Sequence, residues 1–378
     1  MAHITVLHVI TGTPIGGAEI MLFRYLRALG PIATAGHVVI SMMPCGPTAD
    51  MIRKLGIPVE ELGVTGARDM PRAVARLRSR MRDIRPEVVH GWMYHGSLIA
   101  TLARLSGGGR NSGLIWGIHH SLADPRRESR MTRAVLRLLR LLSGRVDAIT
   151  YCSVQSQQQH ESFGLPHDRG VFLPNALDLR EFAPDPAARA RLCAVAGIPP
   201  EREIIGSFAR AHPMKDHEAF AACIAHLAAR GRDVHGLLIG AGQSDGPALR
   251  LAQDMGLAER FTALPPRGDI AALVPGLDVY LLSSAWGEAL PLAVAEAMAA
   301  GVPAVVTDVG DCGWLVGGCG HVCPPGQPEM LATAVARILN LPDTGRAALQ
   351  ARCRARIAHL LSMDDYVAHH DRLYDAAR

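Results

Sequence analysis

The chain of 378 residues is 49% hydrophobic and 20% charged, which is typical of a folded globular protein and excludes a disordered one. Aromatic residues make up only 4%, so base stacking with a nucleic acid has little support. Residues 1–180 hold 22 basic and 13 acidic side chains, whereas the remainder holds 17 and 22. This asymmetry indicates an anionic partner for the first half, unless it only reflects solvated surfaces.

The chain start, MAHITVLHVI, has no positively charged leader before its apolar run, so we expect no signal peptide. The longest apolar run, 289–307, contains Glu296, Gly301 and Pro303 and is too interrupted to span a membrane. We therefore expect a cytosolic protein.

The eight cysteines are too scattered for a disulfide framework in a chain of this length. Cys312, Cys319 and Cys323 lie close to His321 in the sequence, which raises the question of zinc. No C-x-x-C pair occurs, however, and the intervening Gly317, Gly318 and Gly320 indicate a loop. We expect no metal and no cofactor.

In chain order, the first half alternates strand-length aliphatic runs with helical patterns. The opening run, 4–10, is followed by the glycine loop TGTPIGGAE and a helical stretch, which is the first unit of a doubly wound α/β domain. Further strands are expected at 37–43, 87–93, 114–120, 148–153 and 170–178, with a helix at 98–105.

The alternation restarts after a proline-rich crossing segment, and two successive sets predict two similar parallel-sheet domains. We place them at 1–173 and 174–361, with a C-terminal helix at 362–378 that packs back on the first. In the second domain we expect strands at 203–210, 234–242, 260–266, 279–284 and 304–310, and helices at 217–231, 291–300, 328–340 and 344–360.

Each candidate site follows a predicted strand, where ligands of parallel sheets bind. The stretch AWGEALPLAVAEAMAAG places Glu288 on a strand's exit loop and Glu296 inside the next helix. The free amides at that helix start, near Ala289 and Leu290, favour an anion, and the carboxylates suit vicinal hydroxyls. On spacing alone, Glu288 and Glu296 can equally be a loop charge and an ordinary helix-face residue.

A second candidate is FARAHPMKD, where Arg210 and Lys215 follow a strand five positions apart. Two cations that converge on a diphosphate neutralise the charge that grows on a leaving nucleotide. A solvated basic loop is the alternative, although the chain contains only two lysines.

Weaker candidates follow other strands. Gly16 and Gly17 allow close approach of backbone amides to a phosphate, although a plain tight turn explains them equally well. One of His119 and His120 can bind a sugar hydroxyl, or both are structural. Strand exits with Gly240 and Arg267 are typical of a nucleobase pocket.

Together these stretches resemble the retaining glycosyltransferases of family 4, which have the GT-B fold of two Rossmann-like domains facing a cleft. The resemblance runs from GGAE (16–19) to PPGQPEML (324–331), and its most specific parts are E-x7-E, from Glu288 to Glu296, and the pair Arg210 and Lys215. Two positions depart from the family pattern, since Ala176 and Ala209 stand where glycines are usual.

The resemblance implies that the first domain faces a glycan or lipid-linked acceptor and that the second binds the nucleotide sugar. In the second domain, Glu296 is then expected to bind the ribose, Glu288 the donor sugar, and Arg210 with Lys215 the diphosphate. The resemblance also implies that Gly16 and Gly17 lie beside the phosphates and that His119, or His120 if the register slips, faces the transferred sugar. Gly240, Arg267, Ala289 and Leu290 complete the expected donor site. No metal is expected.

We therefore expect a metal-independent hexosyltransferase that moves a sugar from a UDP or GDP donor to an acceptor hydroxyl with retention, in polysaccharide or glycolipid assembly. A nucleotide-sugar epimerase, a sugar phosphorylase and a non-catalytic homologue remain alternatives. Arginines three or four apart in ESRMTRAVLRLLRLLSGR (128–145) predict either contact with an anionic membrane or a surface helix packed on the sheet.

Overall fold

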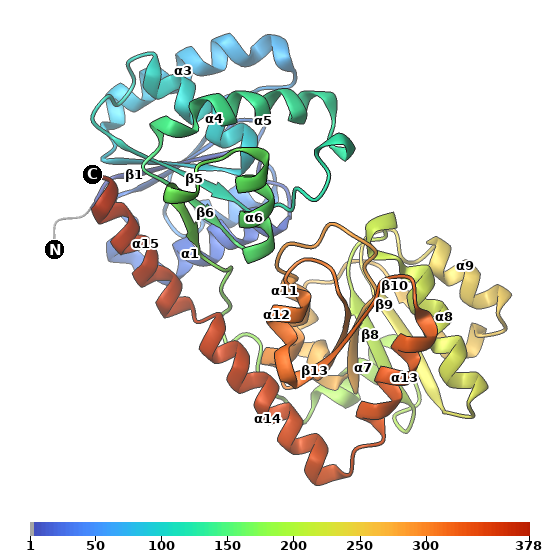
Figure 1. Cartoon of the computed structure of the whole chain (residues 1–378). Helices are drawn as coiled ribbons and strands as arrows, with labels where there is room; N and C mark the ends of the chain where they lie inside the picture. The colour runs from blue at the N-terminus through green and yellow to red at the C-terminus, as the bar shows by residue number, and fades with distance from the viewer. Residues whose placement is uncertain (1–3) are drawn as a thin grey trace. The chain divides into compact units, whose positions relative to one another are not determined.

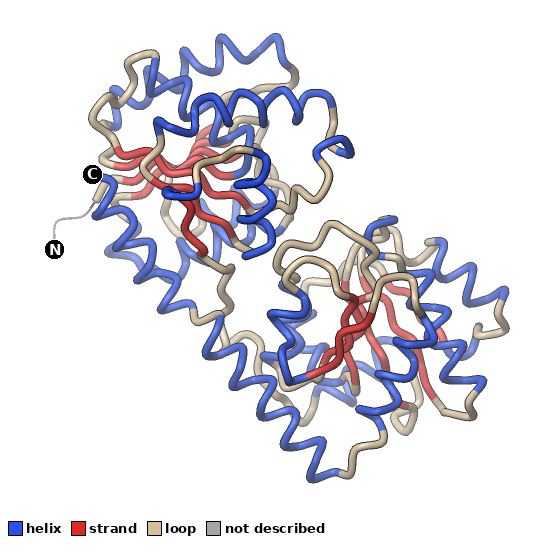
Figure 2. Tube along the Cα trace, viewed as in Figure 1, coloured by secondary structure: helices blue, strands red, loops and turns tan. Residues whose placement is uncertain are grey.

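The computed structural model describes residues 4–378, which form two compact units. Unit 1 comprises the chain up to Ala176 together with Met363–Arg378, and unit 2 comprises Leu177–Ser362. Each unit is built on its own parallel sheet flanked by helices, as Figure 1 and Figure 2 show. The expected α/β class with two doubly wound sheets is confirmed.

The sheet of unit 1 has seven strands in the order β3-β2-β1-β4-β5-β6-β7, all paired in parallel. Its central strands are buried along their whole length because helices cover both faces. α3, α4 and α5 pack on one face, and α1, α2 and α15 on the other. The strands are β1 (Val6–Ile10), β2 (His37–Ser41), β3 (Val59–Glu61), β4 (Val88–Trp92), β5 (Gly113–Ile118), β6 (Ala148–Tyr151) and β7 (Gly170–Phe172).

The helices of unit 1 follow the strands in alternation, except for α15, which returns from the end of the chain. α1 is kinked at Gly30, which has φ 75° and precedes Pro31. The helices are α1 (Gly17–Thr34), α2 (Pro47–Arg53), α3 (Met70–Ile84), α4 (Met93–Leu105), α5 (Arg130–Leu142), α6 (Val154–Phe163) and α15 (Met363–Ala377).

Unit 2 contains a six-stranded parallel sheet in the order β10-β9-β8-β11-β12-β13. α8, α9 and α13 cover one face, and α7, α11, α12 and α14 the other. The strands are β8 (Glu203–Phe208), β9 (Val234–Ile239), β10 (Phe261–Leu264), β11 (Val279–Leu282), β12 (Ala304–Thr307) and β13 (Gly320–Cys323). The helices are α7 (Ala188–Ala196), α8 (His217–Ala229), α9 (Pro247–Asp254), α10 (Ile270–Leu273), α11 (Leu292–Ala299), α12 (Cys312–Val316), α13 (Pro328–Leu339) and α14 (Asp343–Leu360).

Two local expectations were wrong. The run 170–178 is a strand only over Gly170–Phe172, because the chain leaves the sheet before Pro174. Gly320 does not lie in a loop, because it begins the edge strand β13 and pairs with Ala304. A Cβ at Gly320 would lie 2.1 Å from the carbonyl oxygen of Ala304, so close strand packing explains this glycine.

Candidate active site

A buried ion pair with a further hydrogen bond lies in unit 2, where the loops that follow β8 and β11 meet. Lys215 Nζ lies 2.6 Å from Glu288 Oε1, and both side chains are largely buried, with 18% and 7% exposed. Ser284 Oγ donates to the same carboxylate oxygen at 2.5 Å. The sequence-predicted lysine and first glutamate are thus brought together as a hydrogen-bonded ion pair.

The two loops are tied to each other through backbone and hydroxyl groups. The amide of Ala285 donates to the carbonyl of Met214 at 2.8 Å, and Ser283 Oγ donates to the carbonyl of Lys215 at 2.9 Å. Thr307 Oγ1 donates to the carbonyl of Ser284 at 2.6 Å. These contacts fix the backbones that carry Lys215 and Glu288, so the ion pair has a defined place at the carboxyl edge of the sheet.

A third loop, after β12, packs directly against the backbone of Glu288. Gly310 has φ 60°, and a Cβ there would lie 2.2 Å from the Glu288 carbonyl oxygen. The amide of Asp311 donates to the carbonyl of Ala289 at 2.9 Å. Only glycine permits this approach, so the glycine that ends AVVTDVG lets the loop after β12 pack against the backbone of Glu288.

Arg210 differs from Lys215 in its surroundings. Its side chain is exposed, and within residues 4–378 it forms no hydrogen bond or ion pair. Lys215 lies in a short 3₁₀ turn, Pro213–Lys215, that follows the N-cap His212. The structure therefore places a paired, ordered cation and an unpaired, exposed cation on the same loop.

The residues after Glu288 lead into α11. Leu290 is buried in the core of unit 2, Ala289 is half-buried, and Pro291 is the N-cap. Glu296 is half-buried on α11, and its charge together with that of Glu288 adds to burial in raising the pKa of Tyr280. The Tyr280 hydroxyl hydrogen-bonds the backbone of Phe208 at the end of β8.

The remaining candidates of unit 2 have structural partners of their own. A Cβ at Gly240 would lie 2.1 Å from the carbonyl oxygen of Ala209, so this glycine lets the β9 exit pass against the loop that carries Arg210. Arg267 is exposed and forms a two-pronged ion pair with Asp269, with both distances 2.8 Å. Among residues 4–378, no hydrogen bond or ion pair joins Arg267 to Lys215 or Glu288.

In unit 1, His119 and His120 lie just beyond β5 and take different partners. His119 Nδ1 lies 2.9 Å from Asn175 Oδ1, and its ring stacks on Trp92. His120 Nε2 lies 3.0 Å from Glu128. Burial lowers the pKa of His119 to about 4, so its ring is neutral and Nε2 is left as a hydrogen-bond acceptor.

Gly16 is the N-cap of α1 and Gly17 its first residue. A Cβ at Gly16 would meet the Glu19 carboxylate at 2.4 Å, whereas a Cβ at Gly17 would meet nothing within 4 Å. The packing of the chain therefore does not itself demand glycine at position 17.

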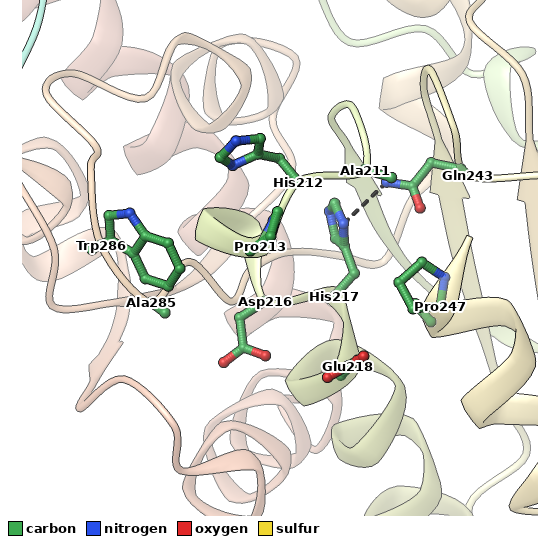
Figure 3. Close-up of a pocket in the computed structure, with 11 residues that line it drawn as sticks. Ala211, His212, Pro213, Asp216, His217, Glu218, Gln243, Pro247, Ala285 and Trp286 are labelled. Carbon is green, nitrogen blue, oxygen red and sulfur yellow. Dashed lines mark hydrogen bonds between the residues drawn. The ribbon is translucent and has the colours of Figure 1, made fainter. Parts of the chain in front are cut away.

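A cavity that the sequence did not reveal lies beside this site in unit 2. It has a volume of about 480 Å³ and is lined by residues from the exits of β8, β9 and β11, among them His217, Gln243 and Trp286 (Figure 3). Only their closeness in sequence to the predicted site residues could have indicated these cavity residues: His217 lies two residues after Lys215, and Trp286 lies two before Glu288.

Within residues 4–378, no group of three or more His, Cys, Asp or Glu side chains is arranged to hold a metal ion, and no helix is long and apolar enough to cross a membrane. Seven of the eight cysteines are buried free thiols.

Both units match known protein families. A model described as "Glycosyltransferase Family 4" matches residues 15–181, and one described as "Glycosyl transferases group 1" matches residues 202–341. The chain is 28% identical to the putative glycosyltransferase EpsF of Bacillus subtilis over 80% of this chain and 79% of that one. It is 34% identical to the 2-deoxystreptamine glucosyltransferase of Streptomyces kanamyceticus over 47% of each chain.

Solved structures agree on the fold. Anabaena Alr3699/HepE in complex with UDP superimposes with a TM-score of 0.86 at 19% identity, over 99% of this chain and 100% of that one. Sucrose-phosphate synthase from Thermosynechococcus elongatus gives 0.79 at 21% identity, over 99% and 98%. These structures show the GT-B fold, and the two family models with the relatives above show a protein of the glycosyltransferase class.

Proposed function

We propose that this protein is a retaining hexosyltransferase of family 4 that transfers a sugar from a nucleotide diphosphate sugar to an acceptor hydroxyl. The observation that carries the proposal is the Lys215–Glu288 pair at the exits of β8 and β11, inside a glycosyltransferase domain. The UDP and UDP-glucose complexes of Alr3699/HepE support a donor of this type. Assembly of a cell-surface polysaccharide or glycolipid is the role that we assign to the product.

Lys215 and Arg210 would grip the diphosphate. An ammonium group has three donors, so Lys215 can keep its bond to Glu288 and still offer two to phosphate oxygens. Arg210 is exposed and unpaired within the described chain, so its guanidinium is available for a bidentate contact. Each preorganised donor to the charge that develops in the transition state is worth about 2–4 kcal/mol.

Glu288 would bind hydroxyls of the donor sugar through the carboxylate oxygen that Lys215 and Ser284 leave open, with the backbone of Ala289 and Leu290 beside it. Glu296 would accept hydrogen bonds from the ribose hydroxyls. We assign Gly240 and Arg267 to the nucleobase side, Gly16 and Gly17 to the phosphates, and His119, through its acceptor nitrogen, to the transferred sugar.

In the proposed reaction, the bond from the anomeric carbon to the phosphate oxygen breaks while the bond to the acceptor oxygen forms on the same face. The acceptor proton passes to an oxygen of the leaving phosphate, so no nucleophile of the protein is required. Positioning and electrostatic stabilisation supply the catalysis.

Thermal unfolding with a panel of UDP-, GDP- and ADP-sugars tests donor binding, because a ligand of the native state raises the unfolding midpoint according to its affinity. One donor should raise it, and NMR of the product should show the anomeric configuration of that donor. Hydrolysis or epimerisation without acceptor, phosphate-dependent cleavage, or binding without turnover would each contradict the proposal.

The proposed role of Glu296 can be tested by changing either the protein or the donor: one variant removes the carboxylate, and one donor analogue removes a ribose hydroxyl. Glu296→Ala should weaken binding of the preferred donor at least tenfold, since a carboxylate that accepts from ribose loses about 1.5–3 kcal/mol of hydrogen bonding. A 2′-deoxyribose version of the donor should bind weakly to the wild type and no more weakly to Glu296→Ala. Additive losses from the two changes would place the ribose elsewhere.

We also propose that unit 1 contacts an anionic membrane through α5. Val135, Leu136 and Leu139 pack on the sheet, whereas Met131, Leu138 and Leu141 form a separate stripe with 49%, 45% and 79% exposed. Four arginines lie along the helix beside this stripe. An exposed apolar stripe next to a cationic face is typical of an interfacial helix.

Sedimentation with vesicles of phosphatidylcholine and phosphatidylglycerol tests this contact. Arg130→Gln with Arg137→Gln should weaken binding more than tenfold, at about 1 kcal/mol for each arginine near an anionic surface. The matched control replaces Arg68 and Arg72, which are exposed elsewhere in unit 1. Equal binding to neutral and anionic vesicles would contradict the proposed contact with an anionic membrane.

A further inference from the structure

The cavity of about 480 Å³ in unit 2 is separate from the Lys215–Glu288 pair, neither member of which lines it. It opens among the exits of three neighbouring strands, β8, β9 and β11, at the edge of the sheet where parallel α/β folds bind ligands. Its volume lies within the range of about 300–1,000 Å³ that is usual for small-molecule sites. Trp286 lies at one end, and Gln243 and Pro247 at the other (Figure 3).

Two buried polar side chains in its wall have unused hydrogen-bonding atoms. Gln243 is 1% exposed and uses its amide nitrogen twice, toward the carbonyl of Ala209 at 2.8 Å and toward His217 Nδ1 at 3.1 Å. His217 is 6% exposed. Since the amide nitrogen can only donate, His217 Nδ1 accepts and the ring proton lies on Nε2. Within residues 4–378, Gln243 Oε1 and His217 Nε2–H have no hydrogen-bond partner.

Burial, together with the charge of Lys215, lowers the pKa of His217 to about 4, so the ring stays neutral near pH 7. The wall therefore offers one neutral acceptor and one neutral donor, on two side chains that are hydrogen-bonded to each other. A hydroxyl group can pair with either the acceptor or the donor, because it both donates and accepts hydrogen bonds. Neither atom is among the fully buried, unpaired side-chain atoms of the described residues, so both remain accessible to a ligand in the cavity.

The remaining lining disfavours an anion and suits a polyol. Asp216 and Glu218 place two carboxylates on the wall, and none of the described lysines or arginines lines the cavity. The Asp216 carboxylate also caps α8 through the amide of Ala219. Trp286, 39% exposed, adds an aromatic face of the kind that packs on the C–H face of a sugar ring.

We propose that this cavity binds a neutral sugar ring of the glycan acceptor or product, a subsite on the unit that carries the Lys215–Glu288 pair. Naming the ring as part of the acceptor rests on the proposed function. Its recognition by Gln243, His217, the carboxylates and Trp286 does not. Because Asp216 and His217 adjoin Lys215 along the chain, a bound ring also orders the loop that carries this lysine.

The experiment uses the full chain with methyl α-D-glucopyranoside, methyl α-D-galactopyranoside and maltose as probes, and choline and inorganic phosphate as charged comparisons. Saturation-transfer NMR reports binding. Fluorescence reports Trp286 as the part of the signal that is lost in Trp286→Phe, because Trp92 and Trp116 are fully buried but Trp314 is only half-buried. At least one neutral sugar should bind, and choline and phosphate should not compete. Stronger binding of either charged probe would overturn the proposal.

Variants locate the sugar. Trp286→Ala should weaken binding about tenfold, Trp286→Phe should retain most of it, and Glu218→Ala should weaken it severalfold. Met255→Ala removes an apolar side chain of similar exposure, 44%, from outside the cavity and should change nothing. Unchanged sugar binding in Trp286→Ala with an intact unfolding midpoint would overturn the assignment.

The nucleotide-sugar panel, run on the same variants, keeps the two proposals apart. A donor that still stabilises Glu218→Ala while sugar binding falls shows two distinct sites. If no donor stabilises any form of the protein but the neutral sugar binds at Trp286, the transferase proposal fails and the sugar site stands. If a donor binds and no neutral sugar does, only the sugar site fails.

Discussion

Glu288 is a buried carboxylate that depends on two donors, Lys215 Nζ and Ser284 Oγ, for its charge to be tolerated. Arg210 has the same proposed role as Lys215 toward a diphosphate but is exposed and carries no partner among the described residues. At the scale of residues, the two cations should therefore differ in what they do for stability, whatever they share in catalysis.

Lys215→Met should lower the free energy of unfolding by about 3 kcal/mol, because it leaves Glu288 buried without its cation. The double variant Lys215→Met with Glu288→Gln should recover most of that stability and none of the turnover. Urea denaturation measures the first effect and a donor-turnover assay the second.

Arg210→Met is the matched control. It should reduce turnover as strongly as Lys215→Met while shifting the unfolding free energy by less than about 0.5 kcal/mol, as expected of an exposed residue. Equal stability of the two single variants would contradict the account of a buried ion pair.

At the scale of elements, α15 packs on one face of the sheet of unit 1 through buried histidines and tyrosines. His90 Nδ1 lies 2.9 Å from the hydroxyl of Tyr374, and His370 packs against Tyr366. Trp92 Nε1 donates to His8 Nδ1, and the other His8 nitrogen lies 2.9 Å from His37 Nδ1. This chain of bonds requires His8 and His37 to be neutral.

Burial lowers the pKa of all four histidines, to about 4 for His37 and about 3 for His370, and well below 6.5 for His8 and His90. Below pH 6.5 the unfolded chain therefore binds more protons than the native one, and stability must fall as the pH falls. The window runs from 6.5 down to the native pKa values.

We expect the unfolding midpoint to drop by at least about 5 °C between pH 6.5 and 5, since each such histidine contributes up to about 1.4 kcal/mol per pH unit. Carboxylates titrate mainly below this interval. His370→Gln should make the profile shallower, as differential scanning calorimetry can measure. A midpoint that is flat from pH 7 to 5 would contradict the neutral cluster.

At the scale of the whole molecule, unit 1 is discontinuous in sequence, because its last helix arrives only after unit 2 is complete. Tyr366, His370 and Tyr374 of α15 are 3%, 1% and 2% exposed, so they belong to the core that α1 and β1 share. The stability of the first half of the chain should therefore depend on its final residues.

Deletion of 363–378 should abolish cooperative unfolding of unit 1, because the loss of even one large buried aromatic side chain costs about 3–5 kcal/mol. A fragment comprising 177–362 should remain folded. Limited proteolysis with mass spectrometry distinguishes the units, and deletion of Arg378 alone is the control. Protease resistance of residues 4–176 after the longer deletion would show that α15 is dispensable.

Much of this architecture is written locally in the sequence. Buried parallel strands are continuous aliphatic runs, such as VLHVI and VYLL, so their positions along the chain could be predicted. Lys215 and Glu288 could be named because they follow such runs, and parallel strands bring their carboxyl ends to one edge.

Other features depended on contacts between distant segments. α6, VQSQQQHESF, has no apolar stripe and is held through Ser156 and His160, which bond to His120 and Tyr94. The Lys215–Glu288 pair and the Gln243–His217 pair likewise join loops far apart in sequence. A sequence determines which segments become strands and which side chains follow them. Only the folded chain decides which of those side chains meet, because burial and hydrogen bonding are set by neighbours that no local pattern specifies.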